Sequence, residues 1–242
     1  MSEVTRIAMW SGPRNISTAM MRSFENRSDA SVVDEPFYAF YLKETGIDHP
    51  MREEVIASQP ISPDEVIEDL IAPLPEDVTV HYQKHMTQHM LPQVPLDWLG
   101  KVKNCFLIRS PEEIVASYAQ KRDTITEEDI GLKRQNELFQ HVKSLTGQVP
   151  PVIDTNDVLK NPREKLSKLC ERVGIPFDEA MLSWPKGRRE SDGVWAPHWY
   201  HAVEDSTGFA PWSPRQITLT RGQQAVADAG MAYYEELKAV AL

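Results

Sequence analysis

Short apolar runs alternate along this sequence with segments of helical periodicity, and this order leaves few possible folds. Apolar runs bounded by turn residues are typical of buried strands. We expect strands at residues 6–10, 30–34, 78–83, 102–108 and 151–155. Because helical segments lie between them, the strands should form a mostly parallel sheet with helices on both faces. The 242 residues suffice for one good core, so the sequence predicts a single α/β domain over residues 1–242.

The connecting segments carry helix signals. Apolar spacing and N-terminal prolines predict helices at residues 16–27, 63–71, 111–121, 127–145 and 162–173, the last ending at Gly174. A further amphipathic helix is expected at about 214–237. Residues 184–215 show no clear period but are rich in tryptophan. A loop of this length inside a compact domain is usually functional or disordered, and its aromatic content favours function.

Charge and composition exclude several classes of function. The net charge is −10 and no lysine or arginine block follows one expected helix, so a nucleic acid is not expected as partner. No apolar stretch has the length of a signal peptide or membrane span, which predicts a cytoplasmic protein that does not enter a membrane. Cys105 and Cys170 lack a CxxC pattern and are expected to be reduced and buried. Nothing in the sequence indicates the oligomeric state.

The first expected strand runs into a turn that has the layout of a phosphate-binding loop, IAMWSGPRNISTAMMRSF at residues 7–24. A helix that starts here presents unpaired N–H groups and the positive end of its dipole to an anion. Arg14 can add a charged fork, and Ser17 and Thr18 can add hydroxyl donors. The alternative is that Ser17 or Thr18 only caps the helix while Arg14 pairs with a surface carboxylate. Because the signature GxxxxGK[ST] is absent, a kinase or a nucleotide hydrolase is disfavoured.

The PRNIST segment at residues 13–18 resembles the PKSGTT-type loop of the sulfotransferases that use 3′-phosphoadenosine 5′-phosphosulfate. The resemblance implies donor-binding roles for four loop residues, Arg14, Asn15, Ser17 and Thr18. Two positions depart from the family pattern. Ile16 replaces the loop glycine, and Ala19 stands where some members have a tryptophan that stacks on adenine. The residue that stacks on the adenine therefore stays open.

The segment FLIRSPEEIVASY, residues 106–118, resembles the 3′-phosphate motif of the same family. Arg109 ends an expected strand, and Ser117 follows eight residues later in a helix. A guanidinium and a hydroxyl can converge on one phosphate if that helix folds back beside the first loop. The alternative is an arginine that caps a sheet edge and an ordinary helix serine.

The segment PKGRRESDGVWAPHWY, residues 185–200, lies where the family has a late loop that closes over the nucleotide. By this resemblance Lys186, Arg188 and Arg189 would neutralise the 3′-phosphate, and Trp195 or Trp199 would cover a base or the acceptor. The alternative is a structural aromatic loop pinned on the surface.

Candidate acid–base groups follow the second and third expected strands. Asp34 and Glu35 end a strand at the edge where open α/β sheets bind ligands, and the resemblance implies that Glu35 is the base. In HYQKHMTQHM, residues 81–90, the resemblance implies Lys84 near the leaving oxygen and His85 or His89 as base. Histidine has a suitable pKa for this role near neutrality, so the choice between these three bases stays open.

His81, His85 and His89 repeat every four residues, a spacing that would form a metal-binding face on a helix. However, VTVHY is typical of a strand, so His81 should not share a helix with the other two. We therefore expect no metal site.

Together the resemblances imply a sulfotransferase with a P-loop nucleotide-hydrolase-like fold. It would transfer a sulfuryl group from 3′-phosphoadenosine 5′-phosphosulfate to a small hydroxyl or amine acceptor by in-line displacement. Arg14, Lys84 and the base would then be the catalytic groups, without a metal, because a sulfuryl group carries less charge than a terminal phosphoryl group. The alternative, favoured by Ile16 and Ala19, is a non-catalytic nucleotide- or anion-binding protein with a degenerate sulfotransferase fold.

Overall fold

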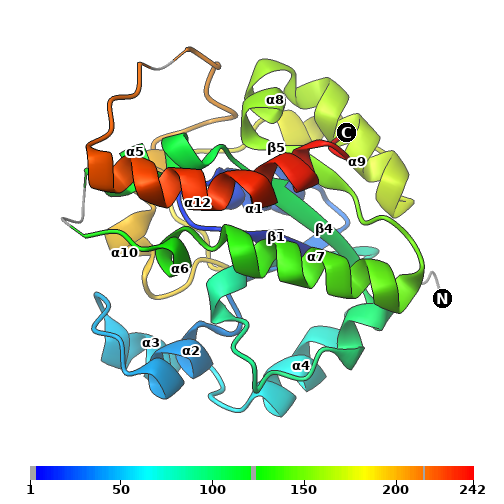
Figure 1. Cartoon of the computed structure of the whole chain (residues 1–242). Helices are drawn as coiled ribbons and strands as arrows, with labels where there is room; N and C mark the ends of the chain where they lie inside the picture. Colours follow the sequence, from blue (N-terminus) through cyan, green and yellow to red (C-terminus); the bar gives the residue numbers. More distant parts are fainter. Residues whose placement is uncertain (1–3, 121–123, 215) are drawn as a thin grey trace.

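A computed structural model describes residues 4–120, 124–214 and 216–242. Its centre is a parallel sheet with strand order β2-β3-β1-β4-β5 (Figure 1). The strands are β1 (Thr5–Ser11), β2 (Ala30–Asp34), β3 (Val80–Met86), β4 (Lys103–Ile108) and β5 (Val152–Asp154). The predicted α/β class and the five strands are confirmed. The third strand begins two residues later than predicted and runs on to Met86, which places Lys84 and His85 inside it.

Helices cover both faces of the sheet (Figure 1). Their bounds are α1 (Ser17–Glu25), α2 (Tyr38–Thr45), α3 (Arg52–Ser58), α4 (Pro63–Ile71), α5 (Pro111–Tyr118), α6 (Glu127–Ile130), α7 (Leu132–Thr146), α8 (Thr155–Lys160), α9 (Pro162–Val173), α10 (Ala196–Trp199), α11 (His201–Glu204) and α12 (Arg221–Lys238). Short 3-10 turns are η1 (Thr87–His89), η2 (Asp97–Lys101) and η3 (Glu179–Leu182). Within the described ranges, no helix combines the length and the apolar character that crossing a membrane requires.

Alternating side chains of the strands feed two separate cores. On one face Trp10 and Phe106 pack with residues of α4, α7 and α12, such as Leu70, Leu138 and Leu237. On the other face the neighbouring strand residues pack with α1, α8 and α9; this set includes Met9, Leu107, Phe24, Val158 and Leu166. Because helices cover both faces, β1 and β4 are mainly apolar along their length, and the edge where the strands end is left for a ligand.

Several predicted helix boundaries were wrong for local reasons. The helix expected at 127–145 is two helices, α6 and α7, broken at Gly131. Gly131 has a φ of 70°, and a Cβ there would lie 3.0 Å from the Thr87 hydroxyl. The last helix starts at Arg221 rather than Pro214, after a capping box in which Thr220 and Gln223 bond to each other's backbone N–H groups. The expected end at Lys121 lies outside the described residues.

Helices α2, α3 and α8 were not predicted at all. They are short, and α2 is built from aromatic residues with a weak apolar stripe, so its periodicity gives little signal. By contrast, α4 and α9 have the predicted bounds, because each starts with a proline and has a clear apolar face. The first helix is two residues shorter at its end than predicted.

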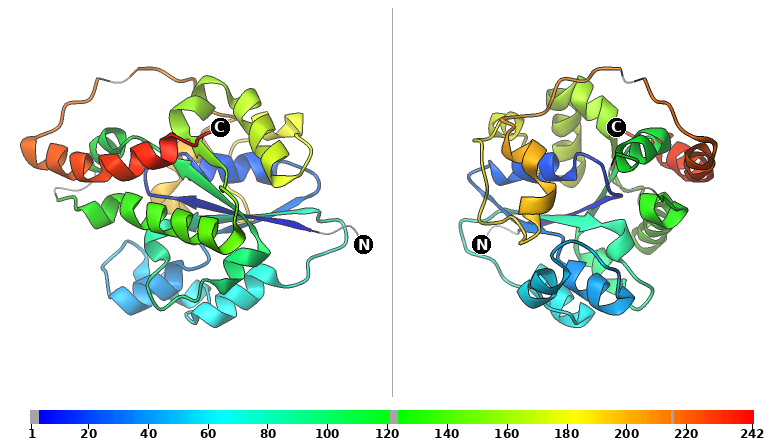
Figure 2. Two further views of the ribbon diagram at one scale, coloured as in Figure 1. Left: turned by 45° about the vertical axis from the view of Figure 1, so that its right-hand side comes forward. Right: turned by 90° about the vertical axis from the view of Figure 1, so that its left-hand side faces the viewer.

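Part of the aromatic segment expected at 184–215 packs against the first helix. Arg22 of α1 pairs with Asp192 at 2.6 Å, and both side chains are almost fully buried. Two short helices, α10 and α11, follow in the same segment. In Figure 2, right, this gold-coloured segment lies across the edge of the sheet where the strands end. The expectation of an irregular loop was therefore wrong in detail, since part of it is helical.

We expect Asp192→Ala to lower the free energy of unfolding by about 3 kcal/mol, because it leaves a buried guanidinium without its main counterion. Chemical denaturation of the variant and the parent protein measures this loss. Glu179→Ala is the matched control, since Glu179 pairs with Arg163 on the surface and should contribute little. Equal losses in the two variants would contradict a special role for the buried pair.

Candidate anion and sulfuryl-transfer site

A cavity of about 440 Å³ opens at the edge where the parallel strands end. Residues that follow each of the five strands line it, which is where open α/β sheets bind ligands. Nine of the predicted site residues line this cavity: Arg14, Asn15, Ser17, Thr18, Glu35, Lys84, His89, Arg109 and Ser117. His85, Lys186 and Arg188 do not.

The loop after β1 is held in shape by its own polar groups and by a close backbone approach. Asn15 Nδ2 donates to the Gly12 carbonyl at 3.1 Å, and Thr155 Oγ1 donates to Asn15 Oδ1 at 2.9 Å. A Cβ at Gly12 would lie 2.7 Å from the Ile130 carbonyl oxygen, so only glycine fits there. The Asn15 side chain thus shapes the loop.

The N-terminus of α1 is open to a ligand. Its N-cap residue is Ile16, whose apolar side chain makes no capping hydrogen bond to the first turn. In the part of the chain that the structure describes, no hydrogen bond involves the hydroxyls of Ser17 and Thr18, both of which line the cavity. The alternative that one of them caps the helix does not match this geometry. Uncapped N–H groups and hydroxyl donors at a helix start form an anion-binding arrangement.

Arg14, Arg109 and Ser117 join the two sequence motifs on one wall of the cavity. Arg14 Nε donates to Ser117 Oγ at 3.0 Å, and an Arg109 Nη donates to the Arg14 carbonyl at 2.6 Å. Arg109 also pairs with Glu113 one turn into α5, at 3.3 Å. Two guanidinium groups that are separated by 95 positions in sequence therefore face one crevice.

The backbone is strained at two points of this cavity. Among the described residues, the non-glycine positions with positive φ are Arg14 at 58°, Glu35 at 45° and Met51 at 62°. Two of these three carry charged side chains into the cavity. Such conformations are unfavourable for residues with a Cβ and tend to occur at functional sites, which supports a ligand-binding role for this edge.

Lys84 lies at the centre of a buried cluster of charged and polar side chains. Its Nζ bonds Asp34 Oδ1 at 2.8 Å, Glu35 Oε1, and the Tyr200 hydroxyl at 2.9 Å. Burial alone would lower the pKa of Lys84, but the charges of Asp34 and Glu35 outweigh it and hold that pKa well above its usual value. The lysine is therefore a permanent cation.

Glu35 is the member of this cluster that reaches the cavity. Burial raises the pKa of Glu35, and the Asp34 charge adds to this effect, while the Lys84 charge opposes it. A carboxylate whose pKa is raised toward neutrality is better suited to accept a proton than an ordinary surface carboxylate.

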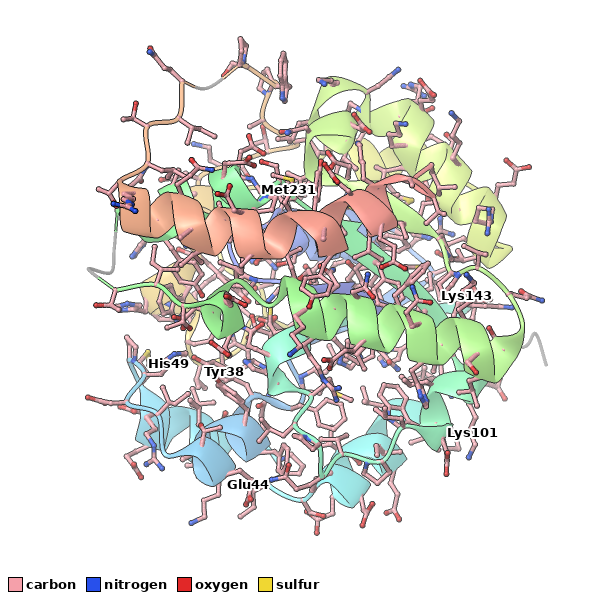
Figure 3. The ribbon with its side chains drawn as sticks, in the orientation of Figure 1. Tyr38, Glu44, His49, Lys101, Lys143 and Met231 are labelled. Atoms are coloured by element: carbon pink, nitrogen blue, oxygen red, sulfur yellow. The ribbon has the colours of Figure 1, made fainter. Side chains whose placement is uncertain are left out.

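His89 lies beside Glu35 in an aromatic stack. Its ring lies between those of Tyr38 and Tyr41, with centroid distances of 4.7 and 4.8 Å, and its Nε2 is 4.0 Å from Glu35 Oε2. Tyr38 in turn bonds His49 Nδ1 at 2.9 Å, and the two side chains lie near each other in Figure 3. Burial and the Lys84 charge hold the pKa of His89 well below its usual value, so this ring is neutral.

His85 points into the core. Its ring stacks on Trp10 at a centroid distance of 4.3 Å and also packs near Trp98 and Phe37. Burial lowers the pKa of His85 to about 3. His81, near the start of β3, bonds the Ser31 hydroxyl of β2. In residues 4–120, 124–214 and 216–242, no group of three or more His, Cys, Asp or Glu side chains is placed to hold a metal ion.

The late segment contributes aromatic rings to the site. Trp195, Trp199 and Tyr200 line the cavity, whereas Lys186 and Arg188 are exposed and Arg189 bonds the Pro185 carbonyl and lies 3.7 Å from Glu25. Tyr38 and Tyr200 are site residues that the sequence analysis missed. The aromatic clusters FYAFY and WAPHWY were the available signal, but neither shows which ring turns inward.

The protein is thus an α/β protein with a parallel sheet, in which the loops after β1 and β4 direct two arginines into one cavity. A family model described as a sulfotransferase domain matches residues 5–241. The chain therefore belongs to the sulfotransferase-domain family, as the motifs indicated.

Two plant proteins are similar in sequence. The chain is 36% identical over 220 residues to branched-chain-amino-acid aminotransferase-like protein 1 of Arabidopsis thaliana and 34% identical over 214 residues to protein 2 of the same name. These matches cover 91% and 88% of this chain but 39% and 37% of the two relatives. The chain thus spans less than two fifths of their length.

Two solved structures are similar in fold. A sulfotransferase from Alicyclobacillus acidocaldarius has a TM-score of 0.56 and 12% identity, with 98% of this chain and 97% of that chain covered. The sulfotransferase domain of the Synechococcus PCC 7002 olefin synthase has a TM-score of 0.53 and 16% identity, with 95% of each chain covered. At these identities the likeness shows the fold alone.

Proposed function

We propose that this protein is a sulfotransferase that takes its sulfuryl group from 3′-phosphoadenosine 5′-phosphosulfate. The observation that carries the proposal is the contact of Arg14 with both Ser117 and Arg109. It joins two anion-binding motifs in the cavity that Lys84 and Glu35 also line. The cavity volume of about 440 Å³ lies within the range of small-molecule and cofactor sites.

The phosphosulfate nucleotide carries anionic groups at its two ends, and the site offers two sets of hydrogen-bond donors for them. We assign Arg14, Ser17, Thr18 and the first N–H groups of α1 to the 5′-phosphosulfate. Arg109 and Ser117 are assigned to the 3′-phosphate. Arg14 uses only its Nε toward Ser117, so its two terminal nitrogens are the donors we assign to the oxyanion. Asn15 acts by holding the loop.

The chemistry needs a proton acceptor and a cation. The acceptor oxygen or nitrogen attacks sulfur, the new bond to sulfur forms, and the bond from sulfur to the bridging oxygen breaks. Glu35 takes the proton of the attacking group, and the electron pair of the broken bond stays on the bridging oxygen of the departing adenosine bisphosphate. Lys84 balances the charge that develops on that oxygen.

We further propose a small hydroxyl or amine compound as acceptor and the cytoplasm as location. Tyr38, Trp199 and Tyr200 give the cavity aromatic walls around Glu35, which suits a small organic acceptor. Cys105 and Cys170 are free and buried, in keeping with a reducing compartment.

The second candidate is a nucleotide-binding protein that has lost turnover. Ile16 and Ala19, which depart from the family loop, favour it, and the two plant relatives are named for a likeness to an aminotransferase. Sulfate-labelled donor and a broad panel of hydroxyl and amine acceptors separate the two candidates. Tight binding of the desulfated nucleotide with no product across the panel would favour the second.

Arg14→Ala and Arg109→Ala should each weaken the binding of adenosine 3′,5′-bisphosphate by roughly 10- to 100-fold, because a charge-assisted hydrogen bond contributes about 1.5–3 kcal/mol. Isothermal titration calorimetry measures the dissociation constants. Arg163→Ala on the outer surface of α9 is the control and should bind as the parent does. Unchanged affinity in both cavity variants would refute the assignment of this wall to the nucleotide.

A further inference from the structure

The Tyr200 hydroxyl uses its whole hydrogen-bonding capacity inside the charge cluster. It donates to Asp34 Oδ2 at 2.6 Å and accepts from Lys84 Nζ at 2.9 Å and from Trp195 Nε1 at 3.1 Å. All four side chains are at least 95% buried. A hydroxyl has one proton and two lone pairs, so every hydrogen-bonding position of the Tyr200 hydroxyl has a partner.

The neighbouring carboxylates of Asp34 and Glu35 differ in the number of hydrogen bonds that they accept. Asp34 accepts from Lys84, from Tyr200 and from the Gly193 backbone N–H at 3.2 Å. In the part of the chain that the structure describes, the Glu35 carboxylate accepts a hydrogen bond from the Lys84 ammonium alone and has His89 Nε2 at 4.0 Å, and 12% of its side chain is exposed. Three hydrogen bonds therefore fix the position of Asp34 beside Lys84, whereas Glu35 faces the cavity, where it can exchange a proton with a bound group.

We propose that Asp34 and Tyr200 are positioning residues of the transfer site, which hold Lys84 in place and leave Glu35 as the one carboxylate of the pair that takes up a proton. This inference rests on the proposed function, since it assigns roles within that site. Lys84 is the common partner, because its three ammonium protons go to Asp34, Glu35 and Tyr200. Its position is thereby set from both sides of the cluster.

The same contacts tie the late segment to the sheet. Gly193, Trp195 and Tyr200 all come from residues 184–215, whereas Asp34 and Lys84 come from β2 and β3. Docking of this segment therefore determines where the lysine points. The sequence resemblance assigned the segment to nucleotide binding through Lys186 and Arg188, whereas Gly193, Trp195 and Tyr200 make buried contacts around Lys84.

The pKa of Glu35 can be measured, and it depends on the charge of Asp34 and on the position of Lys84. The titratable and charged groups that face it are Lys84 from β3, Asp34 from β2, His89 from η1, Tyr38 from α2 and Tyr200 beside α11. The negative charge of Asp34 disfavours ionisation of Glu35, and Lys84 favours it. Removing the Asp34 charge must therefore lower the pKa of Glu35. Removing the Tyr200 hydroxyl leaves Lys84 without one acceptor and shifts it toward Glu35, which acts in the same direction.

The first test needs neither donor nor acceptor. Carboxyl-carbon NMR titrations of protein labelled in its glutamates follow Glu35, whose signal is identified by its loss in Glu35→Gln. We expect Asp34→Asn to lower the pKa of Glu35 by roughly one unit, and Tyr200→Phe to lower it by less. Tyr233→Phe on α12 is the matched control and should leave the titration unchanged. A Glu35 titration that is the same in Asp34→Asn and the parent protein would overturn the inference.

The second test separates positioning from folding. With any acceptor that the parent protein sulfates, Tyr200→Phe and Asp34→Asn should lose roughly 10- to 100-fold in kcat with KM for the donor unchanged, because a displaced lysine misplaces its charge. In Asp34→Asn the acidic limb of the kcat profile should also move to lower pH. Equal losses in kcat and donor affinity, with no movement of the limb, would mean a structural role only. If the parent protein shows no turnover, the proposed function fails, while the titration still decides the inference.

Discussion

Glu35→Gln should retain nucleotide binding and lose turnover by about 10²- to 10⁴-fold, the range for removal of a general base. The amide keeps the shape of the side chain and can still accept from Lys84, so the cluster should stay folded. The amide cannot, however, accept the proton of the attacking group. Because burial raises the pKa of Glu35, turnover of the parent protein should fall as the pH drops through that raised value. The variant should lack this acidic limb.

The measurement is product formation from labelled donor across pH, together with calorimetry of adenosine 3′,5′-bisphosphate. Glu44→Gln is a suitable control, since Glu44 is exposed at the end of the nearby helix α2 (Figure 3). His89→Gln distinguishes the other candidate that lines the cavity. If turnover survives in Glu35→Gln and is lost in His89→Gln, the base is the histidine.

The position of the site could be predicted because it depends on local order alone. Parallel strands all end at one edge, so loops that follow β1, β2 and β4 meet there whatever the rest of the chain does. This is why the sequence could place Arg14, Glu35 and Arg109 at the edge where the cavity opens. Glu35 and Arg109 directly follow β2 and β4, and Arg14 lies three residues after the end of β1.

The choice between His85 and His89 could not be made from sequence, because it depends on where β3 ends. The apolar run predicts an end at residue 83, but the strand continues to Met86 through pairing with β1. His85 is then opposite Trp10 in register, and both side chains turn to the same face of the sheet. His89 lies beyond the strand, in η1, from which its ring reaches the cavity.

Contacts between distant segments gave no sequence signal. The bond between Tyr200 and Asp34 joins residues 166 positions apart, and periodicity carries no information at that range. The same limit explains why the sequence could not show that Lys186 and Arg188 lie outside the cavity. Their charge suggested an anion site, but the backbone N–H of Gly187 bonds the Glu204 carbonyl and the neighbouring basic side chains remain exposed.

Lys84→Met should be the most destabilising substitution in the site, because it leaves two neighbouring carboxylates without their shared cation. Breaking a buried ion pair by removing one partner costs about 3–5 kcal/mol, and turnover should be abolished as well. Without the ammonium, nothing in the cluster opposes the effect of burial on Glu35, so this carboxyl group holds its proton more tightly in the folded state than in the unfolded chain. Stability of the variant therefore rises as the pH is lowered, and the gap to the parent protein narrows.

Denaturant unfolding at several pH values between about 5 and 8 tests this, since ordinary carboxyl groups titrate at and below the lower end of that range. Lys168→Met is the control: Lys168 forms an exposed pair with Glu164 one turn away on α9, and its loss should change stability little at any pH. A Lys84→Met variant whose deficit is the same across the range would mean that Asp34 and Glu35 do not depend on this cation. The cluster would then be a packing feature rather than a set of carboxylates that Lys84 neutralises.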